Sequence, residues 1–162
     1  PLCHPIDKYN IKVFGNQPWH INQYCGFLQG EKLKDLFVSA KICPNLSEPH
    51  AHHYGFDINE RCFKILCAGG FCISDNITSI AKIFSGNGVV FADNPKDFRE
   101  KVDYYLSHDE ERRQIASQGQ EFLLDTHTNF HRIADILNYF GYENEAAGIL
   151  DNWAKTRRQL NA

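Results

Sequence analysis

The chain has 162 residues, of which 43% are hydrophobic and 13% aromatic, and its formal net charge at pH 7 is −3. This length and composition predict one domain with a real hydrophobic core. The negative charge and the absence of a basic run argue against nucleic-acid binding, and no apolar stretch approaches the roughly 20 residues of a transmembrane segment. Because the chain opens at a proline and lacks methionine, we expect a domain cut from a longer polypeptide.

The first third of the chain alternates short apolar segments with a helical pattern. Apolar runs bounded by turn residues predict strands, and apolar residues three and four apart predict a helix. The expected elements are a strand over 11–14, an extended piece over 24–28, a helix over 31–37 and a strand over 40–46.

Three histidines follow in a segment between Pro49 and Gly55. His50, His52 and His53 are ligand types for a transition metal, but the neighbouring sequence supplies no further ligand. We therefore expect loop residues without a bound metal.

Segment 59–75 is the most informative part of the chain. Asn59 can cap a helix, a glycine pair can end it, and a short apolar strand follows. Beyond its first turn the helix is apolar almost all round, which predicts a buried body. Its N-terminus, with Arg61 and Lys64, is a candidate anion site. Lys64 can equally pair with Glu60 at i, i+4 on a solvated edge, and the spacing does not decide between these alternatives.

The alternation continues with a strand over 71–74, a helix over 78–84 and a strand over 89–91. Short apolar strands that alternate with helices predict a parallel sheet covered on both faces. The expected fold class is therefore α/β, a Rossmann-like parallel sheet followed by a C-terminal helical segment. We expect residues 1–141 to form the Rossmann-like domain and residues 142–162 a C-terminal helix and tail.

The last third is helical and carries helix-start signals. The pair Asn94-Pro95 opens one helix, and Ser107 with Glu110 has the spacing of a capping box that would open the next. Gly119 lies in the apolar stripe of that second helix and allows close packing. Thr128 can cap a third helix.

Six cysteines could form disulfides or bind metal, but no C-x-x-C pair is present. Four of them lie in apolar segments, where free cysteine packs as a small core residue. Reduced thiols favour an intracellular, cytoplasmic setting. These four are Cys43, Cys62, Cys67 and Cys72, and the other two are Cys3 and Cys25.

The run GFDINERCFKILCAGGFCISD at 55–75 is accompanied by VFG at 13–15, YCG at 24–26, FADNPKDF at 91–98 and YLSHDEER at 105–112. In content and order these pieces resemble the C-terminal half of GT-B glycosyltransferases. The likeness is greatest to the group that includes the spore maturation protein CgeB.

The resemblance implies a concrete function. GT-B enzymes have two Rossmann-like domains facing a cleft, and the C-terminal one holds a nucleotide-activated sugar without a required metal. This chain would be the donor-binding half of a glycosyltransferase, acting with an N-terminal domain of the same polypeptide on an unknown acceptor, with no cofactor. The implied donor site comprises Gly15, Asn16, Ser47, Gly55, Phe56, Asp57, Ile58, Asn59, Arg61 and Lys64.

One position departs from the family pattern Arg-x-Phe-Glu. Family members usually carry a glutamate that accepts hydrogen bonds from ribose where this chain has Lys64, and lysine has no acceptor. Either the donor binds differently, with Lys64 on a phosphate, or the chain is a degenerate, non-catalytic domain used as a binding or scaffolding module. We also expect an exposed apolar or aromatic face for the N-terminal domain, with Trp19 and Trp153 as candidates.

Overall fold

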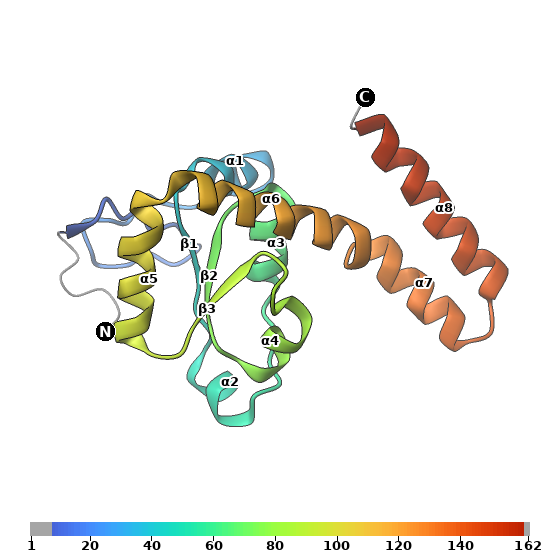
Figure 1. Cartoon of the computed structure of the whole chain (residues 1–162), viewed down its shortest axis with the longest axis horizontal. Coiled ribbons are helices and arrows are strands. Elements are labelled where there is room, and N and C mark those ends of the chain that lie inside the picture. The colour runs from blue at the N-terminus through green and yellow to red at the C-terminus, as the bar shows by residue number, and fades with distance from the viewer. Residues whose placement is uncertain (1–7, 161–162) are drawn as a thin grey trace. The chain divides into compact units, whose positions relative to one another are not determined.

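The computed structural model describes residues 8–160, so Cys3 lies outside the described residues. The chain divides into two compact units, one up to Gln120 and the other from Glu121 onward. Figure 1 labels their helices and strands. No helix in the described part of the chain has the length and hydrophobicity needed to cross a bilayer. The domain boundary expected at residue 141 stays a prediction.

The first unit is built on a three-stranded parallel sheet with β2 at its centre (Figure 1). The strands are β1 (Cys43–Asn45), β2 (Cys72–Asp75) and β3 (Val89–Ala92). Cys72 lies opposite Cys43 on one side and Val89 on the other. Each connection between strands includes a helix, as parallel pairing requires. The predicted α/β class, with a parallel sheet and C-terminal helices, is confirmed.

Five helices lie wholly in the first unit and two lie in the second. The remaining helix, α6, contains the boundary between the units. The helices are α1 (Glu31–Ser39), α2 (Pro49–Tyr54), α3 (Glu60–Ala68), α4 (Thr78–Phe84), α5 (Pro95–Ser107), α6 (Asp109–Thr126), α7 (Asn129–Tyr139) and α8 (Glu143–Leu160).

The segments expected as a strand over 11–14 and an extended piece over 24–28 do not join the sheet. They meet only at an isolated parallel bridge between Val13 and Tyr24. Gly26, two residues after the bridged Tyr24, has a φ of 100°, which takes the second segment out of an extended conformation. The strand prediction for 11–14 was wrong, because only Val13 of that segment makes a bridge.

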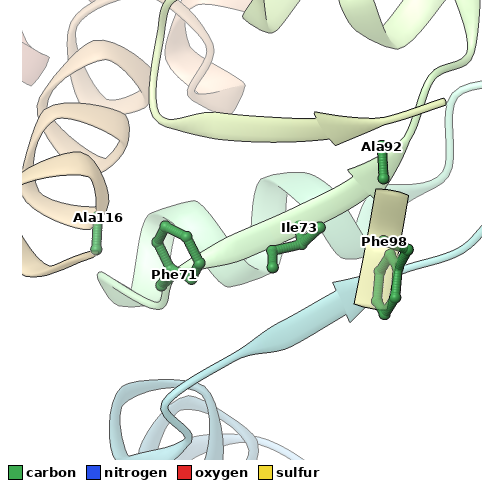
Figure 2. Close-up of a cluster of buried hydrophobic side chains, with 5 residues drawn as sticks. All are labelled: Phe71, Ile73, Ala92, Phe98 and Ala116. Carbon is green, nitrogen blue, oxygen red and sulfur yellow. The ribbon is translucent and has the colours of Figure 1, made fainter. Parts of the chain in front are cut away.

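One face of the sheet packs on α5 and α6 through Phe71, Ile73, Ala92, Phe98 and Ala116, all at most 8% exposed (Figure 2). Ile73 and Phe98 link the central strand to α5. Side chains alternate along a strand, so Cys72 points to the opposite face, which α3 covers. Burial of each large apolar side chain stabilises the fold by about 1.5–3 kcal/mol.

Helix α3 begins after Asn59 and ends at Gly69, whose φ is 82°, as the sequence predicts. It is not buried all round. Its sheet-facing side is buried, but its outer face is exposed because α3 lies on the sheet with only one side. The exposed residues are Glu60, Arg61, Lys64 and Cys67.

The cysteines are also divided between buried and exposed positions. Cys43, Cys62 and Cys72 are free and buried, whereas Cys25 and Cys67 are free and exposed, so the core role predicted for Cys67 was wrong. Burial raises the pKa of the Cys43 thiol to about 12. A hydrogen bond with Cys62, together with burial, raises the pKa of Cys72 well above that of an ordinary thiol.

Two glycines bring α6 against the start of β3. A Cβ atom on Gly88, whose φ is 81°, would lie 2.0 Å from the Cα atom of Gly119. A Cβ atom on Gly119 would lie 3.0 Å from the Cα atom of Gly88 and 2.8 Å from Leu66 Cδ2. The close packing predicted at Gly119 is confirmed. It depends on a second glycine, Gly88, on the facing segment.

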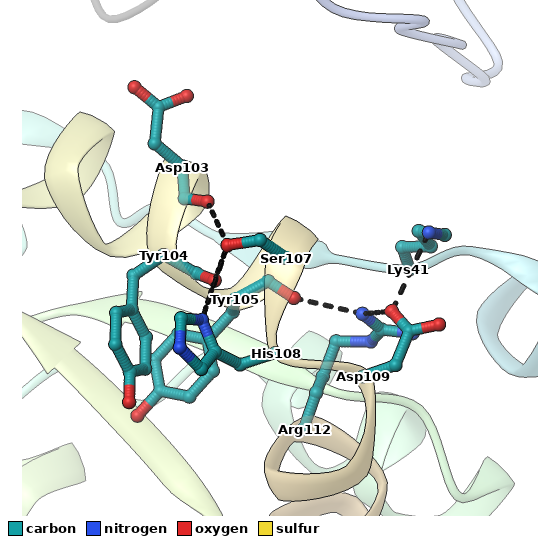
Figure 3. Close-up of polar contacts among 8 residues, drawn as sticks. All are labelled: Lys41, Asp103, Tyr104, Tyr105, Ser107, His108, Asp109 and Arg112. Carbon is teal, nitrogen blue, oxygen red and sulfur yellow. Dashed lines mark hydrogen bonds and ion pairs between the residues drawn. The ribbon is translucent and has the colours of Figure 1, made fainter.

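Ser107 ends α5 and does not cap α6 (Figure 3). Its hydroxyl donates to the backbone oxygen of Tyr104 at 2.8 Å, within the preceding helix. The capping box predicted for Ser107 and Glu110 was therefore wrong, because Ser107 still belongs to α5 and His108 is the residue that directly precedes α6, which begins at Asp109.

A buried arginine fixes the α5–α6 junction (Figure 3). Arg112, 6% exposed, donates through Nη1 to the Tyr105 carbonyl oxygen at 2.8 Å and to Asp109 Oδ1 at 2.5 Å. Lys41 Nζ lies 3.5 Å from the same carboxylate oxygen. The Arg112 guanidinium holds the pKa of Asp109 below its usual value.

The second unit contains α7 and α8 packed together. As predicted, Thr128 caps α7, in a capping box with His131. Trp153 is half-buried, stacks on Phe130 with ring centroids 5.1 Å apart and donates to the Leu124 carbonyl oxygen at 2.9 Å. In the first unit Trp19 is 60% exposed. A docking role for either tryptophan stays a prediction.

Candidate functional site

Polar side chains gather where β1 and β2 end. The two strands are parallel neighbours, so their carboxyl ends lie together, the edge at which open α/β sheets bind ligands. Asn45, the last residue of β1, donates through Nδ2 to Ser74 Oγ at 3.0 Å, and both residues are fully buried. The buried Asn45 Oδ1 has no hydrogen-bond partner among residues 8–160.

Asp75 ties the loop after β1 to the end of β2. Its Oδ2 accepts the Ser47 backbone N–H at 2.8 Å, and its Oδ1 accepts the Ser47 hydroxyl at 3.0 Å. His52 Nε2, from α2, lies 2.8 Å from Asp75 Oδ2. The Asp75 side chain is 13% exposed and that of His52 is 53% exposed. A largely buried carboxylate therefore holds a histidine that is open to solvent.

Arg61 reaches the same loop from α3. Its Nη1 donates to the carbonyl oxygen of Leu46 at 3.1 Å, next to the Ser47 residue that Asp75 holds. The arginine is exposed. Among residues 8–160 its guanidinium makes no other hydrogen bond or ion pair, so its remaining donors are open to a ligand at the first turn of α3, where the helix dipole also favours an anion.

The connection from α2 to α3 is held in place by α4. The Gly55 carbonyl oxygen accepts the Ser79 N–H at 3.1 Å, and the Asp57 carbonyl oxygen accepts the Ser79 hydroxyl at 3.2 Å. His50 donates through Nε2 to Asp57 Oδ2 at 2.8 Å. Phe56 is 72% exposed. The backbone of this connection is anchored while its aromatic side chain faces solvent.

The N-terminus of α3 carries two further predicted site residues. Asn59 occupies the cap position without a capping hydrogen bond, and its Oδ1 atom is buried without a partner in the described part of the chain. Lys64 donates to Glu60 Oε1 at 2.6 Å. Of the two alternatives for Lys64, the structure has the i, i+4 pair.

The structure thus brings together some predicted site residues and not others. Ser47 and Arg61 meet at the end of β1, and segment 55–59 joins α2 to α3 beside it. No hydrogen bond or ion pair between described residues links Gly15 or Asn16 to this edge. The backbone of Gly15 is bonded to Gly26 and to the Tyr24 hydroxyl.

The three histidines lie on helix α2 rather than in a loop, so the loop prediction was wrong. Pro49 occupies the first helical turn, where its missing N–H costs nothing, and Gly55 ends the helix with a φ of 71°. Both signals are visible in the sequence. Among residues 8–160 no three histidine, cysteine or acidic side chains are placed to hold a metal ion.

Sequence reasoning missed His52 and Asp75 as members of this site. Asp75 is recognisable as the acidic residue that ends an apolar strand, but its contacts with Ser47 span 28 residues. Only the pairing of β1 with β2 brings them together.

A protein-family model described as glycosyl transferase-like matches residues 1–138. The match includes the sheet and every residue of the site described above. No curated protein matches the chain significantly, and no solved structure does.

Proposed function

The chain belongs to the glycosyl transferase-like family, and from this premise we propose that it is the donor-binding C-terminal domain of a GT-B glycosyltransferase of the CgeB-like group. It would hold a nucleotide-activated sugar and, with an N-terminal domain of the same polypeptide, transfer the sugar to an acceptor. The observation that carries the proposal is the position of Arg61 and the Ser47 loop at the carboxyl ends of parallel strands.

The donor diphosphate is proposed to lie at the first turn of α3. Arg61 is anchored at one nitrogen and keeps its other donors for phosphate oxygens, and charge-assisted contacts of this kind are the strong ones. Segment 55–59, with the exposed Phe56, would also border the diphosphate, and the loops at Gly15-Asn16 and Ser47 would flank the nucleotide.

This arrangement supports binding of the diphosphate by protein cations and a helix dipole, so the proposal needs no metal. The N-terminal domain would supply the acceptor site and any general base. A cytoplasmic location is part of the proposal, supported by the five free cysteines of the described residues.

A degenerate, non-catalytic binding module is the second candidate function. Lys64 favours it, because this residue offers no acceptor to a ribose and is engaged with Glu60.

Calorimetric titration of the chain with UDP, GDP and ADP tests the donor site. We expect one nucleotide to bind with a Kd of about 0.1–1 mM, since half of the cleft is absent. Arg61→Ala should weaken this binding about tenfold or more, the scale of one charge-assisted phosphate contact. Arg113→Ala, an exposed arginine at the other end of the sheet, is the matched control. Undetectable binding of all three nucleotides at several millimolar would contradict the assignment.

A further inference from the structure

We propose that His52 is a second cationic ligand of the donor diphosphate and that Asp75 is the residue that positions it. The inference rests on the proposed function and adds to it a residue on α2 with a role that depends on pH.

His52 and Arg61 approach the same short loop from different helices. Arg61 on α3 binds the Leu46 carbonyl oxygen, and Asp75 binds the next residue, Ser47, through both its backbone N–H and its hydroxyl. The same Asp75 oxygen that accepts the Ser47 N–H lies 2.8 Å from His52 Nε2. One continuous set of contacts therefore holds both basic side chains at the carboxyl ends of β1 and β2.

The contact with Asp75 determines what the histidine can do. A carboxylate beside Nε2 favours the proton on that nitrogen, so in the neutral ring Nδ1 is only an acceptor. Nδ1 has no polar partner among residues 8–160. It can donate to a phosphate oxygen only when the ring carries both protons. Binding through His52 therefore requires the imidazolium form.

Asp75 is well placed to hold the ring because it is itself fixed. Both of its oxygens are engaged by Ser47, and its side chain is 13% exposed. A carboxylate anchored in this way restricts His52 before a ligand arrives, which lowers the entropic cost of ordering an exposed side chain on binding.

Other titratable groups lie on the neighbouring elements, and a pH profile must be assigned against them. They are Glu48 four residues before His52, His53 next to it in the chain, the His50–Asp57 pair, Asp75 on β2, and Glu60, Arg61 and Lys64 on α3. His50 and His53 are the other histidines among these groups. His50 already donates to Asp57, whereas His53 is exposed and makes no contact with a carboxylate in the described part of the chain.

The test measures the affinity for nucleotide sugars between pH 5.5 and pH 8. UDP-glucose, GDP-glucose and ADP-glucose are suitable probes, because their phosphates lack the terminal group whose second pKa of about 6 would itself change charge in this range. For the probe that binds, we expect the Kd of the wild-type chain to rise about fivefold to tenfold from pH 5.5 to pH 8. His52→Gln should remove this rise, and His53→Gln, the matched control, should keep it.

Asp75→Asn provides an independent readout of the positioning role. Without the carboxylate the ring is no longer held at the edge of the sheet before the ligand arrives, so we expect a weaker Kd at both pH 5.5 and pH 7. Circular dichroism and thermal unfolding of each variant establish that it is folded, which separates a change in the profile from a loss of structure.

The outcomes distinguish this inference from the proposed function. If a nucleotide sugar binds and His52→Gln keeps the wild-type pH profile, the role of His52 is wrong while the donor site stands. An unchanged Kd in folded Asp75→Asn would overturn the positioning role. If no nucleotide or nucleotide sugar binds any form of the chain, the donor site and the role of His52 fall together.

Discussion

At the amino end of the parallel sheet the elements meet through backbone and buried side chains, whereas at the carboxyl end basic side chains from two helices, His52 and Arg61, reach the strand ends and remain open to solvent. Gly88 and Gly119 place α6 against the start of β3 with no room for a methyl group, and Arg112 is 6% exposed. At the other end, the His52 side chain is 53% exposed and Arg61 is exposed.

The difference indicates that the amino end of the sheet stabilises the fold, whereas the carboxyl end is suited to binding a ligand. Close packing and buried polar groups make a site costly to alter, because a clash or an unpaired buried group lowers the free energy of unfolding directly. Exposed polar groups contribute little to stability but can gain much from a charged ligand. We therefore expect substitutions at the amino end to change stability, and substitutions at the carboxyl end to change affinity.

The largest effect is expected from Gly88→Ala. The new Cβ atom would lie 2.0 Å from the Cα atom of Gly119, and the φ of 81° is strained for any residue other than glycine. We expect a loss of about 3 kcal/mol or more in the free energy of unfolding, measured by urea denaturation. Gly86→Ala is the control, because Gly86 has a φ of 75° but open space, so only the backbone term of about 1–2 kcal/mol applies. Equal losses in the two variants would contradict the close contact.

Arg112→Leu should have the next largest effect. The change leaves the Tyr105 carbonyl oxygen without its buried donor and Asp109 without its closest cation. We expect a loss of about 2–3 kcal/mol, together with an unchanged nucleotide Kd in the folded protein. The neighbouring exposed Arg113, changed to leucine, should stay within about 0.5 kcal/mol of the wild type. A weaker Kd in Arg112→Leu with unaltered stability would contradict the expectation that substitutions at the amino end change stability and not affinity.

Lys64→Glu should have the smallest effect, seen in affinity. A second carboxylate beside Glu60 adds negative charge near the proposed phosphate site, so we expect the Kd for the bound nucleoside diphosphate to weaken about twofold to fivefold. Lys64→Gln, which removes the positive charge without adding a negative one, should lie between this variant and the wild type. Tighter binding by Lys64→Glu would instead favour the degenerate module, whose ribose contact the glutamate restores.

Local signals were sufficient for much of the fold. Asn59 and Gly69 mark the ends of α3, Thr128 marks the start of α7, and the apolar runs at β1, β2 and β3 were all expected. These elements follow from capping, glycine conformation and periodicity, which act over a few residues. The same kind of signal was overlooked at α2, where Pro49 opens a helix rather than a loop.

The site was less predictable because its contacts are not local. Arg61 was expected at an anion site from its place in the first turn of α3, but its bond to Leu46 depends on how β1 and α3 pack. Asp75 meets both Ser47 and His52 only because β1 and β2 pair in parallel. No spacing in the sequence encodes that meeting.

The buried thiols of the core have a consequence for chemical labelling. Alkylating reagents attack the thiolate, and burial raises the pKa of Cys43 to about 12 while Cys62 and Cys72 are also buried. Of the cysteines in residues 8–160, only Cys25 and Cys67 are exposed to a maleimide in the folded chain. The rate at which a maleimide modifies the other three cysteines would then report how often the sheet and α3 separate.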